Sequence, residues 1–71
     1  MLKFVVEIYN AEVRKLVEVG ERHRRFNDDW AEIQRIAVDA ISEAHARAKV
    51  EILHPSAQGF VQGDIAKKDR V

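Results

Sequence analysis

The sequence predicts a small α+β domain in which three strands and two helices alternate in the order β-α-β-α-β. Apolar residues recur at every second position in 2–9 and again in 36–41, which is the spacing of a β-strand. The segments that follow, 11–19 and 42–54, repeat apolar residues at three or four positions, which is the spacing of a helix. Phenylalanine and valine occur again between two glycines at 58–66, and an isoleucine follows the second glycine, as expected of a third strand.

The first strand is expected at residues 2–9. Phe4, Val6 and Ile8 share one face of it, and Val5 and Tyr9 share the other. Valine and aromatic residues fit a pleated, half-buried surface, so their abundance here favours a strand.

The first helix is expected to begin after Asn10, whose side chain is suited to accept from the free N–H groups of a first turn. Val13, Leu16 and Val17 form its apolar stripe. Gly20 suits the left-handed position that follows a helix end. A helix of about three turns is marginal alone, so it must pack on another element.

The second strand is expected to end near Ala40, and Ser42 is a favoured N-cap for a helix over 42–54. Ala44, Ala48 and Ile52 recur every four residues and predict the buried stripe of that helix. The proline at position 55 disfavours helical geometry in the residue before it, so the helix should end there.

An alternative reads residues 29–53 as one helix. Asp29 and Glu32 form a capping-box pattern, and Trp30 and Ile33 continue into helical spacing. The protein would then be a long helical hairpin with short flanking strands. We favour a strand followed by a helix, because the strand expected at 59–66 needs partner strands.

The predicted sheet has the first strand in its centre, antiparallel to both neighbours, with both helices on one face. Residues 1–66 are expected to form this single domain, and 67–71 a frayed tail. The predicted core consists of Phe4, Val6, Ile8, Leu16, Val38, Ala44, Ala48 and Ile52.

Composition restricts the classes of function. Twelve basic and twelve acidic residues give a net charge of zero, which argues against a general nucleic-acid or anionic-membrane partner. No apolar run reaches the roughly 20 residues of a membrane span, and the first ten residues make a poor signal peptide. The absence of cysteine fits a reducing compartment, so we expect a cytoplasmic protein.

No motif for catalysis, a metal or a cofactor is recognisable. His23, His45 and His54 have no ligand spacing, and surface or capping roles explain them. Glycine-rich phosphate loops and serine-nucleophile motifs are also missing from the sequence. We therefore expect no enzyme, no metal site and no cofactor.

A basic cluster offers one alternative function. Arg22, Arg24 and Arg25 precede Phe26, and such a group can contact phosphates while the ring stacks on a base. The acids at 28, 29 and 32 weaken the local positive potential. A nucleic-acid-binding accessory domain is accordingly the second hypothesis.

The leading hypothesis is a small non-catalytic interaction module that acts by self-association or by binding another protein. An uncovered sheet face and two free sheet edges favour a homodimer, because so small a chain buries little core alone. Val5 and Tyr9 on that face, together with Trp30, are the predicted interface residues.

Overall fold

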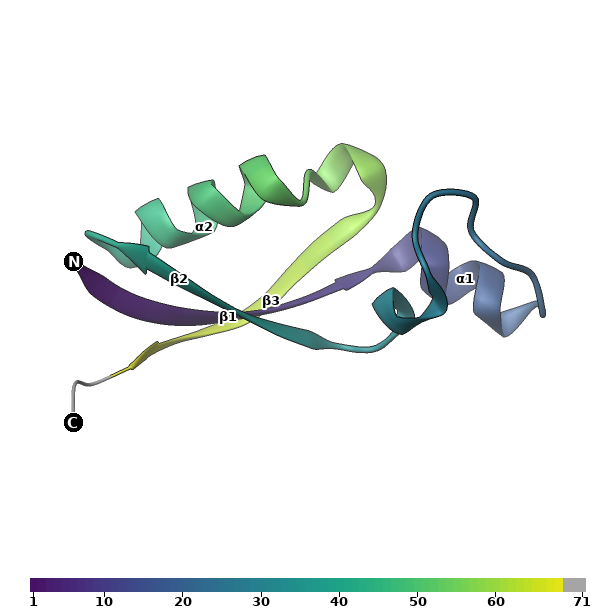
Figure 1. Cartoon of the computed structure of the whole chain (residues 1–71), viewed down its shortest axis with the longest axis horizontal. Coiled ribbons are helices and arrows are strands. Elements are labelled where there is room, and N and C mark those ends of the chain that lie inside the picture. Colours follow the sequence, from purple (N-terminus) through teal and green to yellow (C-terminus); the bar gives the residue numbers. More distant parts are fainter. Residues whose placement is uncertain (69–71) are drawn as a thin grey trace.

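The computed structural model describes residues 1–68, which form a three-stranded antiparallel sheet with a long helix on one face (Figure 1). The predicted β-α-β-α-β order is confirmed, and β2 occupies part of the segment that the alternative reading made helical. The elements are β1 (Leu2–Asn10), α1 (Ala11–Glu18), the 3-10 turn η1 (Asp28–Ala31), β2 (Gln34–Ala40), α2 (Glu43–Leu53), the 3-10 turn η2 (Ser56–Gln58) and β3 (Phe60–Lys68).

The strand order is β2-β1-β3, and β1 is antiparallel to both neighbours, as predicted. β1 and β2 pair without interruption, so that Val5 lies opposite Ala37. The pairing of β1 with β3 is interrupted between Val6 and Ile8, where Gly63 and Asp64 together oppose one residue of β1. This extra residue is a β-bulge, which bends β3 and increases its twist.

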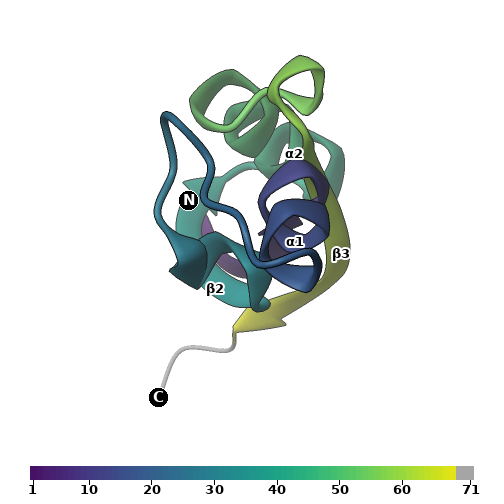
Figure 2. The same ribbon diagram turned by 90° about the vertical axis from the view of Figure 1, so that its right-hand side faces the viewer.

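α2 lies along one face of the sheet, and local signals set both of its ends (Figures 1 and 2). The Ser42 hydroxyl accepts from the His45 N–H at 3.1 Å, as expected of an N-cap. The helix ends before Pro55, where the chain enters η2. Gly59, with φ +98°, then turns the chain into β3.

α1 continues from the end of β1 and extends beyond the sheet, toward the viewer in Figure 2. The Asn10 carboxamide oxygen caps it, accepting from Glu12 N at 2.9 Å and Val13 N at 3.0 Å. Arg14 Nε donates to the Ala31 carbonyl at 2.9 Å, which holds α1 against η1. Both helices were predicted to lie over one face of the sheet. This is correct for α2, whereas α1 packs mainly beside η1 at the end of the sheet.

The core lies between α2 and the sheet. The predicted burial of Phe4, Val6 and Ile8 is confirmed, and Leu16 and Val38 are half-buried. Phe26, Trp30, Ile36 and Ile65 pack against the edges of this core. Its buried members outside β1 are Val13, Ala40, Ala46, Val50 and Phe60.

The predicted buried stripe of α2 is wrong. Ala44, Ala48 and Ile52 are exposed, and the helix buries Ala46 and Val50 instead. Both sets recur at four-residue spacing, so the sequence pattern fits either face of the helix equally well.

Lys67 and Lys68, which were expected in a frayed tail, belong to β3, and the remaining residues of that tail lie outside the described part of the chain. Among residues 1–68, no helix has the length and hydropathy needed to cross a membrane.

Candidate functional site

α2 is apolar on two opposite faces. Ala46 and Val50 are fully buried against the sheet. Ala48 lies two residues from each of them, which is about 200° around the helix axis. Ala48 therefore points to solvent, together with Ala44 and Ile52, whose exposed fraction is 79%. We call Ala44, Ala48 and Ile52 the outer face of α2; Ile41, in the turn before the helix, is 71% exposed as well.

The charged side chains beside the outer face are hydrogen-bonded to other parts of the chain. Lys49 Nζ donates to the Asp39 carbonyl at 2.6 Å, and Arg47 Nη2 donates to the Gly63 carbonyl at 3.0 Å. The Glu51 carboxylate accepts from the Ser56 N–H at 2.9 Å. Long charged side chains can cover apolar surface with their methylenes. Here the charged side chains are directed away from the outer face by their hydrogen bonds, so the outer face stays uncovered.

The opposite face of the sheet carries Val5 and Tyr9, two of the predicted interface residues. Both are half-buried, although no helix covers this face. The Arg14 guanidinium lies over the Tyr9 ring, 3.8 Å from its centroid. The Arg35 guanidinium lies 3.2 Å from the Glu7 carboxylate on the same face. Long charged side chains thus shield part of this surface, which makes it more polar than the outer face of α2.

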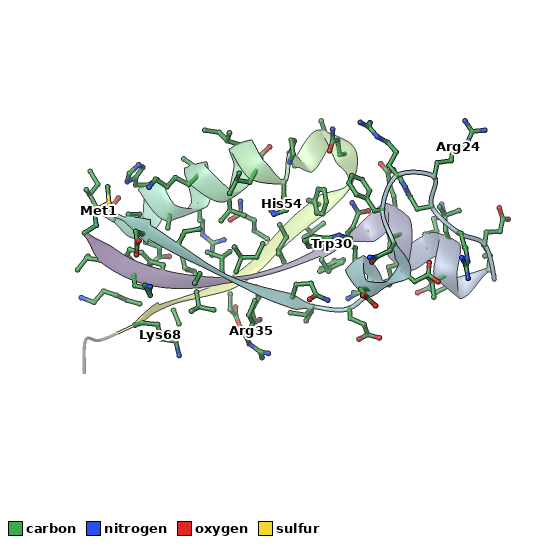
Figure 3. The ribbon with its side chains drawn as sticks, viewed as in Figure 1. Met1, Arg24, Trp30, Arg35, His54 and Lys68 are labelled. Atoms are coloured by element: carbon green, nitrogen blue, oxygen red, sulfur yellow. The ribbon has the colours of Figure 1, made fainter. Side chains whose placement is uncertain are left out.

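Trp30, the third predicted interface residue, joins an aromatic cluster at the end of the core. Its ring centroid lies 5.1 Å from that of Phe60 and 5.1 Å from that of His54. Figure 3 shows the Trp30 and His54 side chains near each other. The Phe26 and Phe60 ring centroids lie 5.0 Å apart with an edge-on geometry. Such contacts stabilise a core beyond the area that they bury. The half-buried Trp30 therefore has a packing role in this chain, and an interface role stays a prediction.

Arg22, Arg24 and Arg25, the predicted phosphate-contacting residues, are all exposed in the loop between α1 and η1. Arg24 points outward from the molecule in Figure 3. His23 organises this loop: its Nδ1 accepts from Arg25 N at 3.0 Å and its Nε2 lies 3.2 Å from the Glu12 carboxylate. This local role agrees with the structural interpretation of that histidine.

A hollow of about 370 Å³ opens beside this loop. Its lining residues include Arg22 as well as Asp28 and Asp29, so charges of both signs face it. The mixture of charges weakens the attraction that a run of phosphates would feel.

A second depression, of about 550 Å³, lies between the C-terminal half of α2 and the start of β3. Arg47, Glu51 and Phe60 are among its lining residues, and it opens widely to solvent. Within residues 1–68, no three histidine or carboxylate side chains come together as metal ligands would.

The sequence interpretation missed the outer face of α2 because it assigned those residues to the core. One signal pointed to it: both four-residue series, 44–48–52 and 46–50, are apolar, whereas a helix on a sheet needs only one. No protein-family model, curated protein or solved structure matches this chain, so its function is argued from these surfaces.

Proposed function

We propose that this chain is a small non-catalytic interaction module that works by self-association, with a second copy covering the outer face of α2. The observation that carries the proposal is the 79% exposure of Ile52 on a helix whose opposite face is fully buried. A helix that is apolar on two faces is typical of one that is buried on both. Exposed apolar surface of this kind is typical of interaction sites.

The arrangement of the outer face suits a second copy. Ala44 and Ile52 lie at equal distances along the helix from Ala48. When two such helices pack antiparallel about Ala48, the small Ala44 of each copy lies beside the large Ile52 of the other. Alternating large and small residues allow facing helices to interdigitate.

Charge does not oppose this contact. The net charge is zero, so two copies do not repel each other at long range. Arg47 and Glu51 lie on the same flank of α2, one turn apart. In the antiparallel arrangement each Glu51 comes beside Arg47 of the second copy, which gives charges of opposite sign.

The expected affinity is modest. Burying one isoleucine side chain contributes about 1.5–3 kcal/mol, so the two Ile52 side chains contribute about 3–6 kcal/mol. Association costs about 4–15 kcal/mol in translational and rotational freedom. The outer face alone therefore supports at most a weak dimer, and a stable assembly needs a further contact.

Sedimentation equilibrium tests the proposal. The parent chain is compared with Ile52→Asp and with Val19→Asp, a control that places the same charge on another exposed apolar residue. We expect concentration-dependent self-association of the parent and of Val19→Asp, and much weaker association of Ile52→Asp. A monomeric parent up to millimolar concentration, or equal association of the two variants, would contradict the proposal.

Nucleic-acid binding, the alternative, has less support because Asp28 and Asp29 share the hollow with Arg22. Salt-sensitive binding of generic RNA that is lost on Arg24→Ala would favour this alternative instead.

A further inference from the structure

β2 is a regular edge strand. It pairs with β1 on one side over all seven residues, and no strand of residues 1–68 pairs with its other side. The backbone groups along such an edge can accept another strand.

The other edge of the sheet is protected. The bulge at Gly63 and Asp64 interrupts β3, and Arg47 donates to the Gly63 carbonyl at 3.0 Å. Bulges and charged groups at an edge are common devices against strand addition. On β2, Lys49 Nζ donates to the carbonyl of Asp39 at 2.6 Å, and this carbonyl keeps a second lone pair for another donor.

The side chains of β2 are complementary to themselves. Arg35 and Asp39 lie two residues on either side of Ala37, on the face of the sheet away from α2. Ile36 and Val38 lie one residue on either side, on the face toward α2. A second β2 strand that runs antiparallel about Ala37 would put Arg35 opposite Asp39 twice, and Ile36 opposite Val38 twice.

We infer that two copies of this chain pair through β2 in this register, centred on Ala37, and form a continuous six-stranded sheet. The inference rests on the proposed self-association and adds a second contact to it. Moving the centre by one residue, to Ile36 or Val38, places Arg35 opposite an uncharged residue. The charges therefore select one register.

The charged side chains remain available for these new pairs. Arg35 is paired with Glu7, yet its side chain is 69% exposed, and a guanidinium has five N–H donors. Asp39 lies 4.0 Å from Lys3, and its side chain is 61% exposed. In the paired sheet Arg35 would lie between Glu7 and the carboxylate of the second copy. Asp39 would lie between Lys3 and the guanidinium of the second copy, so like charges do not meet.

The two contacts reinforce each other. A two-fold axis perpendicular to the sheet leaves both α2 helices on the same side of the six strands. Their two outer faces then point in one direction, where a second such pair can cover both at once. Two linked contacts bind more tightly than either alone, which compensates for the weakness of the outer face by itself.

Charge reversal in the Ile52→Asp background tests the inference, because this background removes the contact of the outer face. We expect Ile52→Asp to remain dimeric in sedimentation equilibrium at high concentration. Adding Arg35→Asp, or adding Asp39→Arg, places like charges opposite each other and should weaken the dimer by about tenfold or more.

Mixing the two charge variants supplies the rescue. In a mixed pair, the chain with Arg35→Asp carries carboxylates at both positions, and the chain with Asp39→Arg carries guanidinium groups at both. Each cross-strand contact then joins opposite charges, so the equimolar mixture should dimerise more tightly than either variant does alone. Small losses of folding stability in the two variants cannot explain a gain of association on mixing, because mixing changes neither chain.

The outcomes separate the two proposals. If the parent self-associates and Ile52→Asp is monomeric, the β2 pairing is wrong and the outer-face contact stands. If Ile52→Asp associates as the parent does and the charge variants do not, the β2 pairing stands and the outer-face contact is wrong. A mixture that stays monomeric contradicts the register centred on Ala37.

Discussion

The two apolar faces of α2 differ in what covers them. The inner face, with Ala46 and Val50, is fully buried against the sheet. The outer face has the same four-residue spacing, yet Ile52 is 79% exposed. Similar side chains on one helix thus have different surroundings: one face stabilises the monomer, and the other is exposed, where we propose an intermolecular contact.

The inner face owes its burial to close packing. Ala46 lies in one cluster with Phe4 and Ala40, where a small residue lets the helix approach the sheet. Val50 packs with Val6, Ile8 and the end of the aromatic cluster. Periodicity reveals that a helix has an apolar stripe, whereas the shape of the opposing surface decides which stripe is buried.

The largest difference between the faces is expected for a buried charge. Val50→Asp should prevent folding, because an unpaired carboxylate in the core costs several kcal/mol and a domain of this size has about 5 kcal/mol to lose. Ile52→Asp should fold normally, because its carboxylate stays in water. Circular dichroism at low protein concentration distinguishes them; a folded Val50→Asp would reverse the assignment of the two faces.

A smaller difference in the free energy of unfolding is expected when a buried and an exposed isoleucine are each truncated to alanine. Ile8→Ala, which truncates a fully buried side chain of β1, should cost about 2–5 kcal/mol. Ile52→Ala should change the stability of the monomer by less than about 0.5 kcal/mol, because the side chain is already exposed. Urea unfolding below the concentration of self-association measures both values. Equal losses would show that the outer face is buried in the monomer.

Enlarging an alanine should likewise destabilise the monomer more on the inner face than on the outer face. Ala46→Leu adds volume where Phe4 and Ala40 leave no room, and should cost about 1–3 kcal/mol. Ala48→Leu adds the same atoms in solvent and should leave the monomer unaffected. Thermal unfolding of the two variants is the comparison, and an unaltered Ala46→Leu would mean that the inner face is loosely packed.

The smallest effect concerns the helix as a whole. Ser42→Ala removes the bond between the Ser42 hydroxyl and the His45 N–H, and should cost about 1 kcal/mol. The cap fixes where α2 begins and not which of its faces is buried. A threonine hydroxyl can accept the same hydrogen bond, so Ser42→Thr should restore most of the lost stability. A loss that threonine fails to restore would indicate that the serine has a role other than capping.

Local signals in the sequence predicted much of this fold. The alternation in β1 and the caps at Asn10 and Ser42 predicted the correct elements, and the connections between the strands predicted the correct strand order. These features depend on neighbours in the chain, so they are readable without the structure. The proline at 55 likewise ends α2 for a local reason.

Features that depend on distant contacts were not predictable. The aromatic cluster joins Trp30 and His54 to Phe60, and no periodicity connects these positions. The bulge at Gly63 becomes visible only when β3 is placed against β1. The choice between the faces of α2 belongs to the same class, and the candidate interaction surface was therefore missed at first.

Thiol labelling at two positions of α2 tests the central claim most directly, because the chain has no cysteine of its own. Ile52→Cys and Val50→Cys are each treated with a thiol reagent over a range of protein concentrations. We predict that Val50→Cys reacts slowly at every concentration, and that Ile52→Cys reacts rapidly when dilute and progressively more slowly as copies associate. Rapid labelling of Ile52→Cys at all concentrations would contradict the claim that a second copy covers the outer face of α2.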